Sequence, residues 1–373
     1  MSPDLSRLPE PRSLGEHAAD ILPDLDTLAE QLRADTGEAL PKLAKLRALI
    51  GPNAFGTGGE ITSELERERE ELLGFARRAV EALRQCRGME VRLMPEEETG
   101  VQALLAFTSR PVILVQEDRF AEPPPVWADL DRIFRSEIET ALRSIGRVEM
   151  SGHPALSWAG TAWIAAPRLV VTNRHVVRYF ATPAGTAETE IHWRIKKGMT
   201  ARIDFGRELD MEPDDGRIFD VPAEAEILVH PVHDLALVPV AGTSRDGAVP
   251  LPSPLSLAAE GRVVGEGRKV YVAGHPARDD HSPQRLLQYR LFQGIFDVKR
   301  LQPGQVMQTL PEKDTLLHDC STLGGNSGSP VIDLETGRVS GLHYAGFHRH
   351  ANLAVALWKL VDDPLLRKAG IDF

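Results

Sequence analysis

The sequence predicts an all-β body preceded by an α-helical N-terminal region that also contains strands, an α+β extension. Three observations predict this arrangement. Apolar residues over about the first 88 positions recur at helical spacing. A run of prolines, Pro123–Pro125, then marks a joint. From about residue 147 to 360, short apolar runs alternate with Gly, Pro and Asp, the pattern of a β-barrel or β-sandwich.

The composition is that of an ordinary globular protein with two or three structural units. The chain has 373 residues, of which 42% are hydrophobic, and a formal net charge of -11; domains usually span about 100–200 residues. This charge disfavours nucleic acid as a partner, and no run of about 18 apolar residues offers a membrane span. The acidic, proline-broken start is unlike a secretory signal. With only Cys86 and Cys320, we expect a protein of a reducing compartment, the cytoplasm.

Residues 1–88 are predicted to form a helical region that regulates the rest of the chain or binds a protein partner. Pro41 and Gly51 bracket one apolar face, and Ser63 with Glu66 forms a capping box ahead of a longer helix that ends near Gly88. The apolar positions are Leu25, Leu28, Ala29, Leu32, Leu43, Leu46, Leu49, Ile50, Leu65, Leu72, Ala76, Val80 and Leu83.

Residues 89–146 are predicted to be an α/β connector. Met89–Met94 and Pro111–Val115 are strand-like. After the prolines, apolar residues at helical spacing predict one amphipathic helix that Gly146 ends. Its apolar positions are Trp127, Leu130, Phe134, Ile138, Ala141 and Ile145.

The body that follows, residues 147–373, is predicted to be built from short strands and to close with a helix over Leu357–Lys368. The apolar runs taken as strands are Ala201–Phe205, Ala225–Val229, Lys269–Ala273, Leu287–Phe296 and Val306–Leu310. Two further runs separated by Pro167-Arg168 predict a β-hairpin from about Gly160 to Thr172.

A glycine-flanked serine is the most informative feature for function. In Gly325-Asn326-Ser327-Gly328-Ser329-Pro330 the glycines allow a tight turn that brings backbone N–H groups close to a reacting carbonyl. A nucleophilic serine also needs a base and a cradle for the oxyanion. His175 follows the predicted hairpin and is a candidate base. Asp234 precedes an apolar strand, where its carboxylate would orient the imidazole.

The three segments TNRHVV (172–177), HDLALV (233–238) and GGNSGSPV (324–331) together resemble the catalytic blocks of chymotrypsin-like serine peptidases of bacterial type. The order His, Asp, Ser separates this family from subtilisins and α/β-hydrolases. The resemblance implies two six-stranded β-barrels with the active site between them. It also implies that His175 is the general base and acid, Asp234 its orienting carboxylate and Ser327 the nucleophile, with the N–H groups of Gly325 and Ser327 as the oxyanion hole. It implies no cofactor and no metal.

Asn326 stands where trypsin-like digestive enzymes carry the aspartate that pairs with a newly formed N-terminal ammonium. A neutral side chain cannot form that ion pair, so we expect no activation by cleavage at the start of the barrel. The N-terminal region is then the candidate for control.

The resemblance places the specificity pocket at Ser321 and Thr322 and along the strand that carries His343 and Gly346. Neither segment holds a carboxylate, which disfavours Arg or Lys before the scissile bond. Thr322 and His343 are similar to the pair that binds glutamate in glutamyl endopeptidases, because a hydroxyl and an imidazolium both donate hydrogen bonds to a carboxylate. Small or apolar residues are the alternative preference. His348 and His350 have no evident third metal ligand.

Taken together, these features predict a serine endopeptidase that acts on proteins or peptides. Two other functions stay open from the sequence: a peptidase-like binding module, and a processing protease that is active only with a bound partner.

Overall fold

The computed structural model describes residues 71, 74–84, 93–98, 100–101, 109–185, 191–259, 264–279, 288–289, 291–347 and 351–373. The chain divides into two compact units. One holds residues 1–111, 280–295 and 348–350, and the other holds residues 112–279, 296–347 and 351–373. No helix in the described ranges is long and apolar enough to cross a membrane.

In the first unit, residues 74–84 are helical, as the capping box and apolar spacing predict. Ala76, Val80 and Leu83 of the predicted apolar face are buried. Residues 95–98 form a second helical stretch. The helices predicted before residue 71 lie outside the described residues. Of the predicted strand Met89–Met94, residues 89–92 also lie outside them, and Leu93 and Met94 are not in a strand.

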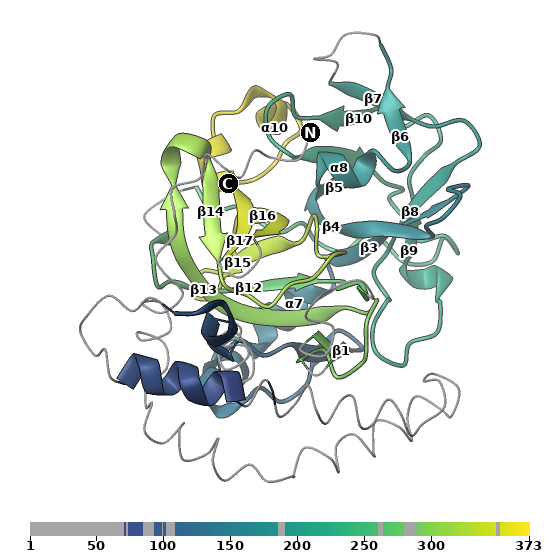
Figure 1. The fold of residues 1–373 in the computed structure, drawn as a ribbon. Coiled ribbons are helices and arrows are strands. Elements are labelled where there is room, and N and C mark those ends of the chain that lie inside the picture. The colour runs from purple at the N-terminus through teal and green to yellow at the C-terminus, as the bar shows by residue number, and fades with distance from the viewer. Residues whose placement is uncertain are drawn as a thin grey trace. The chain divides into compact units, whose positions relative to one another are not determined.

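The second unit contains a nine-stranded antiparallel sheet, seen in Figure 1, that the chain builds largely from consecutive hairpins. The strand order is β6-β7-β10-β11-β5-β4-β3-β8-β9. The bounds are β3 Ile145–Ser151, β4 Trp158–Ala166, β5 Leu169–Thr172, β6 Ala181–Pro183, β7 His192–Ile195, β8 Thr200–Asp204, β9 Ile218–Asp220, β10 Ile227–Val229 and β11 Ala236–Pro239.

The predicted hairpin is confirmed in this sheet. Strands β4 and β5 pair antiparallel around Arg168, which adopts a φ of 61° at the turn. A short helix, α8 (Arg174–Val177), directly follows β5, and the strand β11 pairs with β5 on its other edge. These two pairings bring the ends of β5 and the start of β11 together.

A second sheet closes into a six-stranded barrel, as the family resemblance implies. Its order is β12-β15-β16-β17-β14-β13, and β13 also pairs with β12 to close the ring. The bounds are β12 Lys269–Gly274, β13 Arg300–Leu310, β14 Thr315–His318, β15 Pro330–Asp333, β16 Val339–Phe347 and β17 Ala351–Ala356. The hairpin β1 (Ile113–Gln116) and β2 (Arg119–Phe120) extends this sheet from the edge of β13.

The expectation of a second closed barrel is wrong for the first sheet, which is open over its described strands. Its two edge strands, β6 and β9, are short and stand next to prolines. Pro183 ends β6, and Pro222 lies two residues beyond β9. Proline has no N–H to donate, which limits further pairing at β6. At β9, the backbone N–H groups of Ala241 and Arg245 bind the carbonyl oxygens of Asp220 and Ile218.

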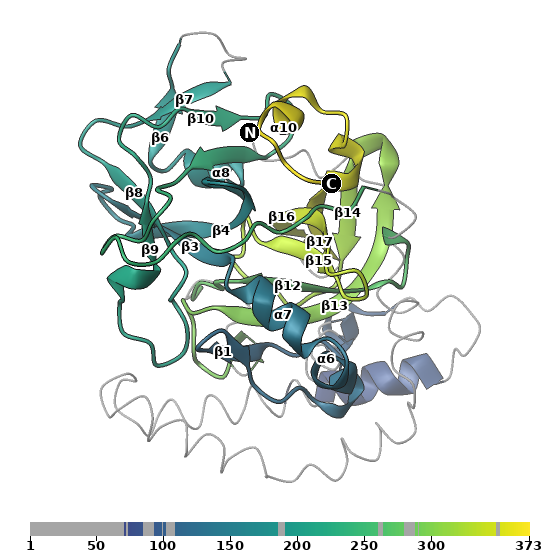
Figure 2. The ribbon, with the colours of Figure 1, turned by 180° about the vertical axis from the view of Figure 1, so that it is seen from behind.

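The amphipathic helix expected before the body is broken into shorter pieces. The structure has the turn η2 (Pro125–Trp127), then α6 (Ala128–Arg132) and α7 (Arg135–Leu142), and β3 begins at Ile145 instead of the chain ending a helix at Gly146. The break turns the exposed Ile133 to solvent. All residues of the predicted apolar face are buried or half-buried and lie in one cluster with Tyr271 and Leu301 of the barrel, beside which Figure 2 shows both helices.

Two other predicted elements differ from the structure. Leu287–Phe296 is not a strand in its described part, because helical turns occupy 288–289 and a turn with positive φ at Gln293 and Gly294 follows. The closing helix is divided into η6 (Leu357–Leu360) and α10 (Pro364–Lys368), since the Asp363 carboxylate caps a new helix start that Pro364 favours. The remaining short elements are η3 (Asp215–Arg217) and η5 (Pro311–Lys313).

The buried ammonium group of Lys299 joins several of these elements. Its Nζ lies 2.8 Å from Glu208 Oε1, and both side chains are fully buried. It also donates to the carbonyl oxygens of Leu142 (2.9 Å) and Phe205 (3.0 Å). The second carboxylate oxygen of Glu208 accepts from the N–H of Asp118 at 2.8 Å, in the β1–β2 turn. Lys299 and Glu208 thus connect the β1–β2 hairpin and the end of α7 to the segment around Phe205 that follows β8.

Replacing Lys299 by methionine would remove the cation nearest to the buried Glu208 carboxylate and leave, among the described residues, only Arg217, at 3.9 Å, beside it. We expect the free energy of unfolding to fall by about 3–5 kcal/mol, as measured by urea denaturation. Lys269→Met is the matched control, because the Lys269–Asp129 pair is 43% and 50% exposed and should contribute at most about 1 kcal/mol. Equal effects of the two substitutions would contradict the assigned role of Lys299.

Candidate active site

His175 and Asp234 are in direct contact at the end of the nine-stranded sheet. His175 Nδ1 lies 2.5 Å from Asp234 Oδ2, and the backbone N–H of His175 donates to Asp234 Oδ1 at 2.9 Å. Asn173 Nδ2 holds the Asp234 carbonyl oxygen at 2.8 Å. The imidazole is therefore positioned through Nδ1, while 39% of its side chain stays exposed and reachable by a substrate.

The environment of Asp234 keeps its carboxylate ionised. Burial by itself raises the pKa of this carboxyl group. The hydrogen bonds from His175 and the positive charges of His175 and Arg174 outweigh this effect of burial. The pKa of Asp234 therefore lies below its usual range. An ionised Asp234 can stabilise a proton on the His175 ring.

The segment 324–327 is held by its carbonyl groups. Each of these four consecutive carbonyl oxygens accepts a hydrogen bond, so each peptide plane is fixed. The bonds are Ala277 N to Gly324 O (2.6 Å), Thr161 Oγ1 to Gly325 O (2.9 Å), Ser329 N to Asn326 O (2.9 Å) and Thr161 N to Ser327 O (2.9 Å).

The N–H groups of the same loop alternate between bonded and open. The N–H of Asn326 donates to Leu323 O at 3.1 Å, and that of Gly328 donates to His343 O at 2.9 Å. Among the described residues, the N–H groups of Gly325 and Ser327 have no acceptor. These two are the predicted oxyanion-hole donors, and they remain available for an oxygen atom of a bound molecule.

Two glycines of the loop satisfy strict steric requirements. Gly325 and Gly328 have φ values of 86° and 90°. A Cβ atom at Gly328 would lie 2.0 Å from the Thr161 carbonyl oxygen, and one at Gly325 would lie 2.6 Å from the Trp158 ring. Glycine is thus required at both positions for two reasons: the backbone has a positive φ, and a Cβ atom would clash with neighbouring atoms.

Ser327 lies close to the helix that carries His175. A Cβ atom built on Gly160 would be 2.8 Å from both the Ser327 carbonyl oxygen and Val176 Cγ2. Gly160 therefore separates the serine loop from the residue next to His175, and only glycine allows this approach. The structure brings the regions of all three predicted residues together.

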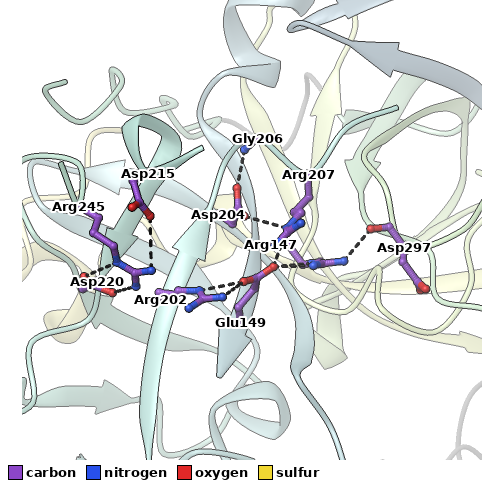
Figure 3. Close-up of polar contacts among 10 residues, drawn as sticks. All are labelled: Arg147, Glu149, Arg202, Asp204, Gly206, Arg207, Asp215, Asp220, Arg245 and Asp297. Carbon is purple, nitrogen blue, oxygen red and sulfur yellow. Dashed lines mark hydrogen bonds and ion pairs between the residues drawn. The ribbon is translucent and has the colours of Figure 1, made fainter. Parts of the chain in front are cut away.

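A network of arginines surrounds the buried carboxylate of Glu149, as Figure 3 shows. The Glu149 carboxylate is bound by Arg147 (2.5 Å), Arg202 (2.7 Å) and Arg207 (2.8 Å). Burial raises the pKa of Glu149, but the hydrogen bonds and charges of the arginines outweigh it and lower the pKa overall. Arg147 stacks over the Trp158 ring at 5.1 Å from its centroid. The network thus holds Trp158 in place against Gly325.

Asn326 is buried inside its own loop. Its side-chain Nδ2 donates to Leu323 O at 3.3 Å. A Cβ atom at Gly274 would lie 2.7 Å from Asn326 Oδ1, so the amide packs against that glycine. The side chain makes a local contact within the loop that needs no ammonium partner.

The predicted specificity residues Thr322 and Gly346 are joined by a residue that sequence reasoning missed, Asn352. The Thr322 hydroxyl donates to Asn352 Oδ1 at 2.7 Å, and Asn352 Nδ2 donates to Cys320 O at 2.6 Å. Gly346 pairs with Asn352 between β16 and β17. No motif marks this asparagine; only the pairing of β17 brings it to the site. Ser321 is half-buried in the same segment.

His343 is fully buried and contacts a second histidine, His318, which sequence reasoning also missed. The two rings approach at 3.2 Å between His318 Nε2 and His343 Nδ1. Burial, followed by the charges of His318 and His175, lowers the pKa of His343 well below its usual value. The imidazolium expected at this position is therefore a neutral ring in the unliganded protein, and it can donate one N–H. Burial lowers the pKa of His318 to about 4.

Within the described residues, no three His, Cys, Asp or Glu side chains gather in a way that could hold a metal ion. His348 and His350 lie outside those residues. Sequence reasoning also missed Thr161, which binds two carbonyl groups of the serine loop. Its place at the start of a predicted strand was the one available signal.

A β-sheet with a His–Asp pair, together with a closed barrel that carries a glycine-flanked serine, resembles the arrangement of trypsin-like peptidases. A family model described as a trypsin-like peptidase domain matches residues 160–342 of this chain, a range that includes His175, Asp234 and Ser327.

The chain is also similar to solved structures of Rv3671c from M. tuberculosis. An inactive form with a serine-to-alanine mutation, from strain H37Rv, is 19% identical with a TM-score of 0.40, and the match covers 69% of this chain and 97% of that one. The active form of the Rv3671c protease is 18% identical with a TM-score of 0.41, covering 68% and 90%. No curated protein matches the chain significantly.

The buried His318 makes stability depend on pH. Its pKa in the fold, about 4, lies below the usual value of 6.5, so the unfolded chain binds the proton more readily. The neutral His318 therefore contributes to the free energy of unfolding above pH 6.5, and this contribution is lost as the pH falls toward 4. It amounts to about 3 kcal/mol at most. We expect His318→Gln to reduce the pH dependence of urea unfolding over this window. An unchanged slope would contradict a neutral, buried His318.

Proposed function

We propose that the chain is a serine endopeptidase with Ser327 as nucleophile, His175 as general base and acid, and Asp234 as the carboxylate that orients His175. The observation that carries this proposal is the loop of Ser327. It leaves two N–H groups open for an oxyanion beside a histidine that an ionised aspartate holds through Nδ1.

In the proposed reaction, Ser327 Oγ attacks the scissile carbonyl carbon while His175 Nε2 takes the hydroxyl proton. The carbonyl oxygen gains negative charge and accepts hydrogen bonds from the N–H groups of Gly325 and Ser327. His175 then passes the proton to the leaving amine, and the peptide is left as an ester of Ser327. Water attacks this ester with His175 again as the base, which releases the acid product and restores the serine.

Labelling with a fluorophosphonate probe tests this function. We expect the full-length protein to react at one serine, Ser327→Ala to lose all labelling, and Ser151→Ala, at an exposed serine of β3, to label as the wild type does. The reason is that only a serine with a base and an oxyanion hole forms the phosphonyl ester at a measurable rate. A wild-type protein that does not label would support the alternative of a binding module and overturn the proposal.

We further propose a preference for glutamate before the scissile bond, with small or apolar residues as the alternative. A substrate carboxylate would take the Thr322 hydroxyl proton in place of Asn352 Oδ1, and His343 would supply a ring N–H. A substrate carboxylate beside His343 would favour its protonated form and thereby raise its pKa on binding. Arg or Lys stays disfavoured, because neither pocket segment holds a carboxylate to pair with a buried cation.

Peptide pairs that differ only by Glu or Gln before the scissile bond test this preference. We expect kcat/KM to be at least tenfold higher for Glu, about 1.4 kcal/mol, and His343→Gln to remove most of that difference. Equal cleavage of the Glu and Gln peptides, or preference for Ala or Leu, would select the alternative.

Control by the N-terminal region is part of the proposal. It is supported by the neutral Asn326, which cannot form an ion pair with a new N-terminal ammonium, and by the predicted helical character of residues 1–88.

A further inference from the structure

We propose that Thr161 is a positioning residue for the oxyanion hole: its hydroxyl and its N–H hold the serine loop in the conformation that leaves the N–H groups of Gly325 and Ser327 open. This inference rests on the proposed function and names a residue outside the triad and the hole itself.

The hydrogen bonds of Thr161 fix the orientation of two peptide planes in the serine loop. In a trans peptide the N–H points opposite to the carbonyl of the same plane, so fixing a carbonyl also fixes an N–H. Thr161 binds the carbonyl oxygens of Gly325 and Ser327, at 2.9 Å each. These two planes turn the N–H groups of Asn326 and Gly328 into the loop, where Leu323 O and His343 O accept them. The one plane between them carries the open N–H of Ser327. The plane before them carries the open N–H of Gly325, and the Ala277 N–H holds its carbonyl, Gly324 O, at 2.6 Å.

The Thr161 hydroxyl itself forms several hydrogen bonds. A threonine hydroxyl has one proton and two lone pairs. The proton goes to Gly325 O, and one lone pair accepts the backbone N–H of His275 at 3.1 Å. The second faces His275 Nδ1 at 3.3 Å. A neutral His275 with its proton on Nδ1 completes this set, and burial favours that neutral ring by lowering its pKa.

Thr161 itself is held in place by the strand that carries it. The residue lies on β4 and is fully buried, and its carbonyl oxygen accepts from Thr172 Oγ1 at 2.7 Å. A β-branched side chain has few rotamers in a strand. The hydroxyl therefore cannot turn away from Gly325 without breaking buried hydrogen bonds. Thr161 thus anchors the glycine-rich loop to the β4–β5 hairpin and limits the conformations that the loop can adopt.

The test compares two substitutions at Thr161. Thr161→Val keeps the shape and removes the hydroxyl, whereas Thr161→Ser keeps the hydroxyl. We measure kcat and KM on a peptide substrate and the rate of fluorophosphonate labelling. Loss of a direct oxyanion donor costs about 10²–10³ in kcat. For the loss of a positioning bond we expect a tenfold to hundredfold fall in kcat and labelling rate, with KM nearly unchanged. Thr161→Ser should restore both to near the wild-type values.

Ser144→Ala is the matched control for the loss of a buried hydroxyl. Ser144 is buried, and its hydroxyl donates to Ser253 O at 2.7 Å, outside the serine loop. We expect kcat of this variant to equal that of the wild type. If Thr161→Val does not fold, Thr161→Ala removes the hydroxyl without placing a methyl group against the His275 amide.

The outcomes separate the two proposals. A wild-type protein without fluorophosphonate reactivity would overturn the proposed function. A reactive wild type with an unchanged kcat in Thr161→Val, an equal loss in Thr161→Ser, or a change confined to KM would overturn the role of Thr161 alone.

Discussion

The planarity of the peptide bond is the constraint on which the site depends. A loop rich in glycine has many conformations available, yet oxyanion binding needs two N–H groups aimed at one point. The structure meets this need by bonding the carbonyl oxygen of every residue from Gly324 to Ser327. The N–H groups then have no remaining freedom, and the two left open belong to Gly325 and Ser327.

One β-hairpin serves both halves of the proposed catalytic machinery. Strand β4 supplies Thr161, which contacts the serine loop, and β5 leads directly into α8 with His175. Thr172 joins the two strands through the Thr161 carbonyl. The hairpin β4–β5 and the helix α8 therefore position both His175 and the loop of Ser327. Gly160 has no side chain, which leaves room for Ser327 and Val176 to approach each other closely.

The sequence predicts the parts of the site that depend on local chemistry. The glycine-flanked serine, the hairpin before His175 and the position of Asp234 ahead of a strand all follow from residue order and turn chemistry. Asn352 and His318 were not predictable, because β-strand pairing over more than twenty residues brings them to Thr322 and His343. The same reason explains the errors in the fold. Apolar spacing predicted one helix from Trp127, but α6 ends at Arg132 and α7 begins at Arg135, and both pieces bury apolar residues in the same cluster. Closure of a sheet depends on which strands pair at its two edges, and the three catalytic segments do not determine that pairing for the first sheet.

A crystal structure of the protein with a peptidyl boronate would show how the serine loop binds an oxyanion, because the boronate imitates the tetrahedral intermediate. We expect a bond from Ser327 Oγ to boron. One boronate oxygen should lie about 2.7–3.1 Å from the N–H groups of Gly325 and Ser327, with Gly325 O still bound to Thr161. A boronate attached to another residue, or an oxygen held by other donors with the serine loop rearranged, would contradict the proposed roles of Ser327 and its loop.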